Sequence, residues 1–324
     1  MIAPSEIAGL FTAALDRPEL RQAPRLGLPP LPGAAAALAA LALGRLRPGA
    51  SVLAVTAGPQ ELEALHADFL AFSHGARLEP VFLPAIEGNA EADDPELAGV
   101  RLAALRALTG DRTDRTDRTD RTDRTDRTDR RYVLTSVHAL QQPVPDPAAI
   151  EAAAVRLQVG AEHAFEDLAG RLVAAGYARV AEVSAKGELA VRGGLLDVWP
   201  ATAPMPLRAE FLGAALESLR VFDPGTQCSV EKRNEAWLPP CQAAKLRTVR
   251  LTDLLPPGAT VLWLDHDRLR QFAETRAMES GGDHLTWEAL AAAVAACRPG
   301  LEIFSGDPQP AATPTLPFEI AAVP

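Results

Sequence analysis

GELAVRGGLLDVWP, residues 187–200, and PLRAEFLGAALESLRVFDPGTQ, residues 206–227, decide the fold of the middle of this chain. Strand-like runs follow one another here with only short, glycine-containing turns between them. In Leu207–Phe211 apolar residues alternate with charged ones, so one face of that strand is expected to pack inward while the charges face out. Because the connections are short, the pattern predicts antiparallel pairing of the strands. An amphipathic helix predicted at residues 165–175 is the natural cover for the inner face.

Helical and strand-like segments alternate on the N-terminal side of these stretches. Helices are expected at residues 34–46, 61–72 and 94–108, and strands at residues 51–56, 81–83 and 132–136. This alternation predicts a parallel sheet covered by helices, a class that often binds nucleotides at the carboxyl ends of its strands. After Pro239-Pro240 the same pattern returns, with a strand at 261–264 and a helix at 287–296. A second crossing into the first sheet is therefore expected.

A tandem repeat interrupts the first of these regions. Residues 111–130 hold six copies of Asp-Arg-Thr followed by Asp129-Arg130, with no apolar residue among them. Asp and Arg alternate one for one, so the net charge is near zero and binding to nucleic acid would be weak. A low-complexity polar tract cannot bury enough surface to offset its ordering entropy, which predicts a disordered loop.

The composition is that of an ordinary folded protein, and 324 residues are enough for two or three domains. A formal net charge of -10 disfavours a surface that grips nucleic-acid phosphates, because such a surface needs clustered positive charge. We find no signal peptide and no apolar run long enough to span a membrane, so a cytoplasmic location is expected. The three cysteines are widely spaced and form no Cys-x-x-Cys pair.

The two quoted stretches closely resemble the UvrB interaction domain, which UvrB shares with bacterial transcription-repair coupling factors. The match runs from residue 177 to residue 227 and keeps the family's order of residues. Its members include Gly187-Glu188, Arg192-Gly193-Gly194, Asp197, Arg208, Glu210-Phe211, Arg220, Phe222-Asp223-Pro224 and Gln227. Weaker similarity on both sides extends the resemblance to most of the chain outside the repeat. The chain is thus similar to the N-terminal, UvrB-like region of the coupling factors.

This resemblance implies an α/β fold: a degenerate, helicase-motor-like parallel α/β lobe with an inserted, mainly antiparallel α+β domain that binds UvrA. Four parts are then expected. They are a first α/β segment at residues 1–145, the UvrA-interaction domain at 146–238, a returning α/β segment at 239–305 and a linker at 306–324.

The phosphate-binding loop of the motor lobe is altered in this chain. In UvrB that loop needs the pattern Gly-x-x-x-x-Gly-Lys-Ser/Thr, but at the corresponding place Gly33 is followed by Ala34 and Ala35. Without the Lys cation and the hydroxyl that ligates Mg²⁺, ATP binding should fail, so neither a cofactor nor a catalytic residue is expected. The tyrosine-rich hairpin with which UvrB threads DNA is also missing, since only Tyr132 and Tyr177 are present. Direct DNA binding is therefore expected to be weak or absent.

The resemblance places Arg192 and Arg208 at positions that face UvrA, with Arg179 as a weaker candidate. The planar donor fork of Arg pairs bidentately with carboxylates and is common among interface anchors. Leu212 stands where some relatives have a second Phe as an aromatic anchor, so the interface is expected to be weakened or retuned. The implied function is a non-catalytic adaptor that recruits UvrA to stalled RNA polymerase, and the remaining domains of a longer protein are further expected partners.

The sequence leaves other interpretations of these residues open. An Arg in a sheet is often solvated or part of an internal ion pair, for example Arg208 with Glu210 or Glu217, and Phe211 is expected in the core. For the whole chain, the alternatives are a UvrB-like, DNA-dependent ATPase or helicase lobe, and an intramolecular autoinhibitory lobe that masks the UvrA-binding surface.

The remaining polar candidates are explained more simply. The six histidines show neither an i, i+4 pair nor a cysteine at ligand spacing, so no metal site is expected. Asp265, His266 and Asp267 could be taken for acid-base residues, but they directly follow a predicted strand. We expect them to begin a helix, with the acidic residues near its N-terminus.

Overall fold

The computed structural model describes residues 25–31, 33–47, 49–73, 78–86, 94–109, 131–242, 245–281, 284–297 and 299–306. The Asp-Arg-Thr tract and the expected linker after residue 306 lie outside them. The chain divides into two compact units, which we describe separately. The first is drawn from residues 1–85, 107–143 and 250–324, and the second from 86–106 and 144–249. Within the described ranges, the helices are all too short or too polar to cross a membrane.

A six-stranded parallel sheet forms the centre of the first unit, in the order β1-β16-β15-β2-β4-β3. In that order the strands are Arg25–Leu28, Leu301–Ser305, Thr260–Trp263, Val52–Thr56, Tyr132–Ser136 and Val81–Leu83. Every residue of β2, β4, β15 and β16 is buried. Burial on both faces explains why these strands are continuous apolar runs and not alternating ones. The predicted return of the chain into the first sheet is confirmed by β15 and β16.

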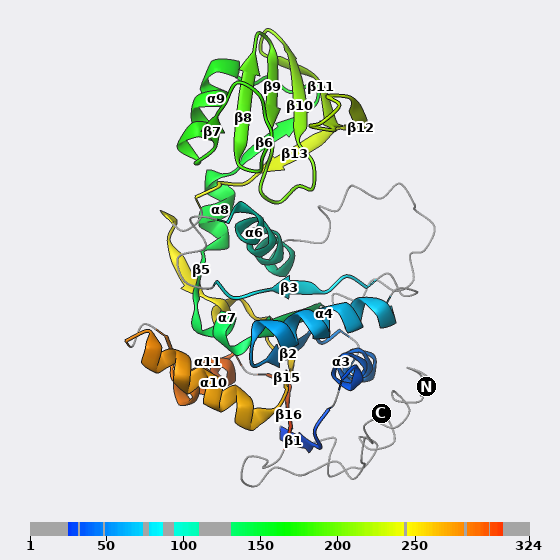
Figure 1. The fold of residues 1–324 in the computed structure, drawn as a ribbon, viewed down its shortest axis with the longest axis vertical. Helices are drawn as coiled ribbons and strands as arrows, with labels where there is room; N and C mark the ends of the chain where they lie inside the picture. Colours follow the sequence, from blue (N-terminus) through cyan, green and yellow to red (C-terminus); the bar gives the residue numbers. More distant parts are fainter. Residues whose placement is uncertain are drawn as a thin grey trace. The chain divides into compact units, whose positions relative to one another are not determined.

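Helices cover both faces of this parallel sheet. They are α3 (Ala35–Leu46), α4 (Pro59–Ser73), α7 (Val137–Gln141), α10 (His266–Glu279) and α11 (Trp287–Ala296), with the 3-10 turn η4 at Leu251–Leu254. Figure 1 shows α3 on one side of the sheet and α10 with α11 on the other. A core of leucines, alanines and aromatic residues lies between α3, α4 and the strands. The α/β expectation, with both parallel and antiparallel sheets in one chain, is confirmed.

The second unit contains a six-stranded sheet in the order β12-β11-β10-β9-β8-β7. In that order the strands are Ser229–Arg233, Ala215–Phe222, Leu207–Leu212, Leu195–Val198, Glu188–Arg192 and Ala178–Arg179. All neighbouring pairs are antiparallel except β7 with β8, which is parallel. The helix α9, Phe165–Ala174, adds Leu168 and Leu172 to the core on one face of the sheet (Figure 1). This helix is the cover that the sequence predicted.

Smaller elements complete the chain. Two short antiparallel strands, β6 (Val155–Gln158) and β13 (Glu235–Leu238), pair in the second unit, and β5 (Pro143–Pro145) pairs with β14 (Thr248–Arg250). The helix α8, Pro147–Ala153, is capped by the Asp146 carboxylate, which accepts a hydrogen bond from the Ala148 amide at 3.0 Å. This cap satisfies a donor that a helix N-terminus otherwise leaves unpaired.

The helix α6, Pro95–Thr109, packs within the second unit at Gly99. A Cβ atom added to Gly99 would lie 2.0 Å from the carbonyl oxygen of Ala201 and 2.4 Å from its carbonyl carbon. Backbone atoms cannot rotate out of the way as the end of a side chain can. Glycine at this position therefore allows the helix and the loop after β9 to approach closely, at the cost of a lower helix propensity.

Two glycine substitutions should separate this packing constraint from helix propensity. Gly99→Ala is expected to lower the free energy of unfolding by about 1–3 kcal/mol, because the new methyl group overpacks the contact with Ala201. Gly170→Ala in α9 is the matched control, since no atom lies within 4 Å of its added Cβ, and it should raise stability by about 0.5–1 kcal/mol. Urea unfolding followed by tryptophan fluorescence measures both. Equal shifts in the two variants would contradict the proposed contact.

Candidate functional site

The candidate site lies on the face of the second sheet that points away from α9, which we call the outer face. Its residues are Ala190, Arg192, Leu195, Asp197, Arg208, Glu210, Leu212, Ser218 and Arg220. Strand register aligns most of them in two rows, Ala190-Asp197-Arg208-Arg220, which continues to Lys232 on β12, and Arg192-Leu195-Glu210-Ser218. The residues between them along the strands, such as Leu189, Leu196 and Ala209, are buried in the core. Alternation along the strands thus separates the charges from the core, as the sequence predicted for β10.

Arg208 is held by an ion pair in the middle of this face. Its Nε lies 2.7 Å from Asp197 Oδ1 and its Nη2 lies 2.9 Å from Asp197 Oδ2, which is a bidentate arrangement. The side chain of Arg208 is 18% exposed and that of Asp197 is 9% exposed. The hydrogen bonds to Asp197 raise the pKa of Arg208, although burial acts to lower it. Bidentate, charge-assisted pairs of this kind are among the strongest side-chain hydrogen bonds.

Two more residues hold the Arg208 guanidinium. Its Nη2 donates to Gln227 Oε1 at 2.8 Å, and its carbon Cζ lies 4.4 Å from the centre of the Phe222 ring. Arg208 therefore has an internal role, and the partner is Asp197 rather than the Glu210 or Glu217 considered from the sequence. The sequence alternation did not reveal this partner, because Asp197 is brought opposite Arg208 only by the pairing of β9 with β10.

Arg220 lies directly opposite Arg208 in the pairing of β10 with β11. Like charges in directly opposed positions destabilise a sheet. Here each guanidinium has its own carboxylate, since Arg220 Nη2 lies 3.3 Å from Glu210 Oε2 while Arg208 pairs with Asp197. Glu210 Oε2 also accepts a hydrogen bond from the Ser218 hydroxyl at 2.6 Å. The outer face is therefore an alternating network of charges and not a uniformly basic patch.

Arg192, at the end of β8, is the more accessible of the two main arginine candidates. Its side chain is 50% exposed. Its Nε and Nη2 donate to the Ala181 carbonyl at 3.1 and 2.7 Å, and Nη2 lies 3.4 Å from Glu182 Oε2. These bonds tie the segment after β7 to β8 and leave Nη1 as the nitrogen available to a partner.

Leu212 and Phe211 occupy opposite faces at the end of β10. Leu212 is 73% exposed, the most exposed large apolar side chain of the described part of this unit. Phe211 packs against the core, and its ring lies 5.0 Å from that of Phe165. The expected core role of Phe211 is confirmed, and Leu212 is left as an apolar side chain in solvent on the outer face.

Arg179 lies on β7, the strand at the edge of the sheet. It is exposed, and its register partner on β8 is Leu189, which faces the core. Arg179 is thus separate from the outer-face rows that contain Arg192 and Arg208. The structure does not bring the three arginines together at one point.

Gly33, Ala34 and Ala35, where the sequence suggested an altered phosphate loop, lie at the start of α3 in the first unit, and Ala35 is the first residue of that helix. Gly33 has φ +53°, and no atom of the described residues lies within 4 Å of a Cβ built on it. Ala34 is the N-cap of α3 and makes no side-chain hydrogen bond to the helix. This helix start therefore offers backbone amides without a side chain that could hold phosphate or Mg²⁺.

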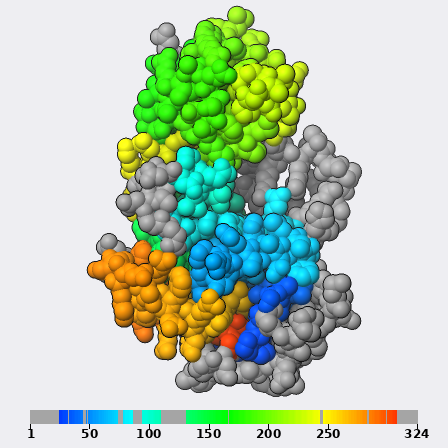
Figure 2. All heavy atoms as spheres, in the orientation of Figure 1, coloured from blue at the N-terminus to red at the C-terminus, as the bar shows by residue number. Residues whose placement is uncertain are grey.

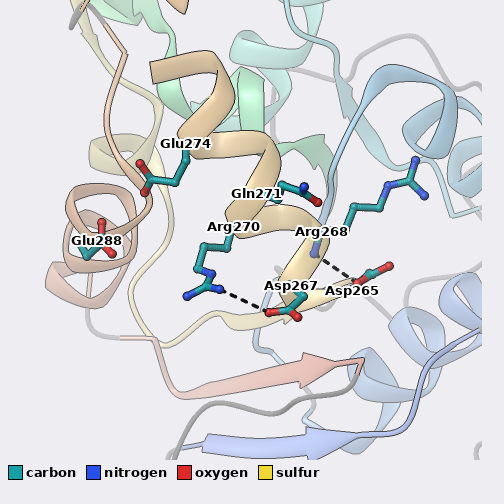
Figure 3. A pocket seen from close by; sticks show the side chains of 7 residues that line it. All are labelled: Asp265, Asp267, Arg268, Arg270, Gln271, Glu274 and Glu288. Carbon is teal, nitrogen blue, oxygen red and sulfur yellow. Dashed lines mark hydrogen bonds and ion pairs between the residues drawn. The ribbon is translucent and has the colours of Figure 1, made fainter. Parts of the chain in front are cut away.

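A hollow beside α10 and α11 is lined by Asp265 and Asp267, two of the other polar residues noted in the sequence. Figure 3 shows its lining, in which Asp267 and Arg270 approach to 3.9 Å while Glu274 and Glu288 lie nearby. Asp265 caps α10 by accepting from the Arg268 amide at 3.4 Å, so the helix-start interpretation is confirmed. Burial lowers the pKa of His266. In the described ranges no three His, Cys, Asp or Glu side chains are grouped so that they could hold a metal.

The pair of Arg208 with Asp197 leads to a prediction about stability. Asp197→Ala leaves the Arg208 charge partly buried without its carboxylate and opposite Arg220, so the free energy of unfolding should fall by about 1–3 kcal/mol. Glu231→Ala is the control, because Glu231 pairs with Arg233 on the exposed strand β12 and should change stability by less than about 0.5 kcal/mol. Urea unfolding compares the two. An Asp197→Ala variant as stable as the control would contradict the importance of this pair.

Comparison with known proteins agrees with the sequence resemblance. Residues 155–243 match the model of the UvrB interaction domain. The transcription-repair-coupling factor of Mycobacterium tuberculosis is 33% identical over 233 residues, which is 69% of this chain and 18% of that protein. The coupling factors of Myxococcus xanthus and Escherichia coli are 39% and 33% identical over 127 and 103 residues, or 39% and 32% of this chain and 10% and 9% of those proteins. The matched region is thus less than a fifth of each relative's length.

Proposed function

We propose that this chain is a non-catalytic adaptor, a UvrB-like region of a coupling factor that binds UvrA and so recruits it to stalled RNA polymerase. The observation that carries the proposal is the outer face, because an exposed Leu212 and a half-exposed Arg192 share it within a segment that matches the UvrB interaction domain. The centres of protein interfaces are more apolar than the rest of the surface and are enriched in Arg.

The proposed domain plan follows the sequence resemblance. The UvrA-interaction domain, residues 146–238, is inserted between α/β segments at 1–145 and 239–305 that form one lobe, and residues 306–324 lead onward. The interleaved strand order supports this plan, since β15 and β16 from the later segment lie between β1 and β2 from the earlier one. The remaining domains of a longer protein would carry the motor and the polymerase contact.

The first lobe is proposed to be a degenerate motor lobe that no longer binds ATP. In open parallel sheets, ligands bind outside the carboxyl ends of the strands, and β1 leads there into Gly33, Ala34 and Ala35. A motor loop needs a Lys to reach the phosphates and a hydroxyl to ligate Mg²⁺. Neither is available at this helix start, which argues against the alternative of an active ATPase.

Titration with Mg-ATP tests the absence of nucleotide binding. The 324-residue chain is expected to give no saturable heat in isothermal titration calorimetry at nucleotide concentrations that saturate a UvrB control, because Ala34 and Ala35 supply neither charge nor hydroxyl. Saturable, Mg²⁺-dependent binding would overturn the non-catalytic part of the proposal and favour the ATPase alternative.

A single truncation tests the docking surface. Leu212→Ala is expected to weaken binding of purified UvrA by about tenfold, because an exposed apolar anchor is lost without any buried contact being disturbed. Val173→Ala is the matched control, since Val173 is 46% exposed on α9, which packs against the opposite face of the sheet. Both affinities are measured by biolayer interferometry with the full chain. If the parent does not bind UvrA, the proposed function is wrong, whereas parent-like binding by both variants would refute the assignment of Leu212 to the docking surface.

A further inference from the structure

Gln227, in the turn between β11 and β12, has an unusual backbone conformation. Its φ is +60°, and Asp265 is the other non-glycine residue of the described ranges with a positive φ. Glycine adopts this left-handed conformation freely, whereas a residue with a Cβ is strained by it. Asp265 is explained as the cap of α10. Gln227 needs another explanation, because such strain tends to persist where the side chain has a task.

The turn that contains Gln227 is well defined without its side chain. Asp223 Oδ1 accepts hydrogen bonds from the amides of Gly225 and Thr226 at 2.9 and 2.8 Å. The Gln227 amide donates to the Asp223 carbonyl at 2.8 Å, and the Asp223 amide donates to the Cys228 carbonyl at 2.9 Å. These bonds close the turn through the backbone and Asp223, and the Thr226 hydroxyl adds a longer contact by accepting from the Cys228 amide at 3.4 Å. Glycine at position 227 could make the same backbone bonds.

The side chain of Gln227 connects this turn to Arg208. Its Oε1 accepts from Arg208 Nη2 at 2.8 Å, while its Nε2 donates to the Pro224 carbonyl at 2.9 Å. The Pro224 contact fixes the orientation of the amide group, so the oxygen faces the guanidinium. The Gln227 carbonyl lies 3.4 Å from Arg208 Nη1 and adds a longer contact.

The combined contacts determine which part of Arg208 can meet a partner. Asp197 takes Nε and one hydrogen of Nη2, Gln227 takes the other hydrogen of Nη2, and Phe222 stacks on the guanidinium. Only Nη1 keeps donor capacity beyond the long contact to the Gln227 carbonyl. Asp197 contacts the guanidinium along the edge formed by Nε and Nη2. Gln227 contacts it from a second direction, through the other hydrogen of Nη2.

We propose that Gln227 is a positioning residue for the docking surface: its amide, held by a left-handed backbone, fixes Arg208 so that Nη1 points to the partner protein. The inference rests on the proposed function, since the partner is taken to be UvrA. Figure 2 shows the yellow-green surface that includes β12 at one edge of the second unit. An oriented donor favours binding because less rotational freedom of Arg208 remains to be lost.

Substitution of Gln227 by glycine and by glutamate separates the orientation of Arg208 from the stability of the fold. Gln227→Gly removes the amide and its two hydrogen bonds but relieves the backbone strain, so these opposing effects should leave the melting temperature close to that of the parent while the affinity for purified UvrA falls about five- to tenfold. Gln227→Glu keeps an oxygen that can accept from Arg208 and adds a charge that attracts the guanidinium, which offsets the lost donation to Pro224 and the repulsion between the carboxylate and that carbonyl oxygen, so its affinity should stay within about threefold of the parent. Thr226→Ala is the control, because it removes a hydroxyl contact within the same turn and not the Gln227 side-chain contact with Arg208, and it should bind like the parent.

The full chain and purified UvrA are used for every variant, with Leu212→Ala included to test the surface independently. Weakened binding by Leu212→Ala together with unchanged binding by Gln227→Gly would overturn only the positioning role. Equal losses in the Gly and Glu variants would also overturn it, because the side chain would then act through its own turn. So would a melting temperature that falls in step with affinity, because the loss would then reflect stability. Failure of the parent to bind UvrA would instead refute the proposed function.

Discussion

The pair formed by Arg208 and Asp197 is the interaction on which the arrangement of the second sheet's outer face depends. Partial burial of two charged groups costs free energy unless the hydrogen-bonding atoms of both groups have partners. Both oxygens of Asp197 are used, and Gln227 and Phe222 complete the surroundings of the guanidinium. The pair lies where β9, β10 and β11 are in register, so it favours this register over one shifted by a residue, which would turn the charges toward the core.

The same pair also determines how the neighbouring charged side chains on the outer face can be arranged. Because Arg208 is neutralised by Asp197, Arg220 can lie opposite it and pair with Glu210. Among the groups left for a partner are Nη1 of Arg208, the half-exposed Arg192 and the side chain of Leu212, with Lys232 exposed beside Arg220. A surface with few free donors and one apolar anchor favours a specific partner over general attraction to phosphate, which agrees with the net charge of -10.

The parallel sheet of the first unit follows a different constraint. Its central strands are buried on both faces, so their sequence is set by packing and contains few polar side chains. Glu302 is an exception in β16, where it accepts from Arg25 at 3.0 Å and from the Trp263 indole at 3.3 Å. The alanine-rich start of α3 fits the same demand for close packing, since Ala37, Ala39 and Ala40 are fully buried. Burial of these small side chains explains the alanine-rich sequence of this helix.

The sequence by itself determined the features that depend on local pattern. Alternation predicted the inner and outer faces of β10, short turns predicted antiparallel pairing, and helical spacing predicted α9 as the cover, because these signals act between residues that are near in the chain. The family resemblance supplied Arg192, Arg208 and Leu212 as candidates. Only the tertiary structure decided that Asp197 and Gln227 hold Arg208, that the short β1 and β16 pair at the edge of the parallel sheet, and that Gly99 of α6 packs on Ala201. Each of these depends on strand register or on contact between distant segments, and such contacts leave no periodic signal in the sequence.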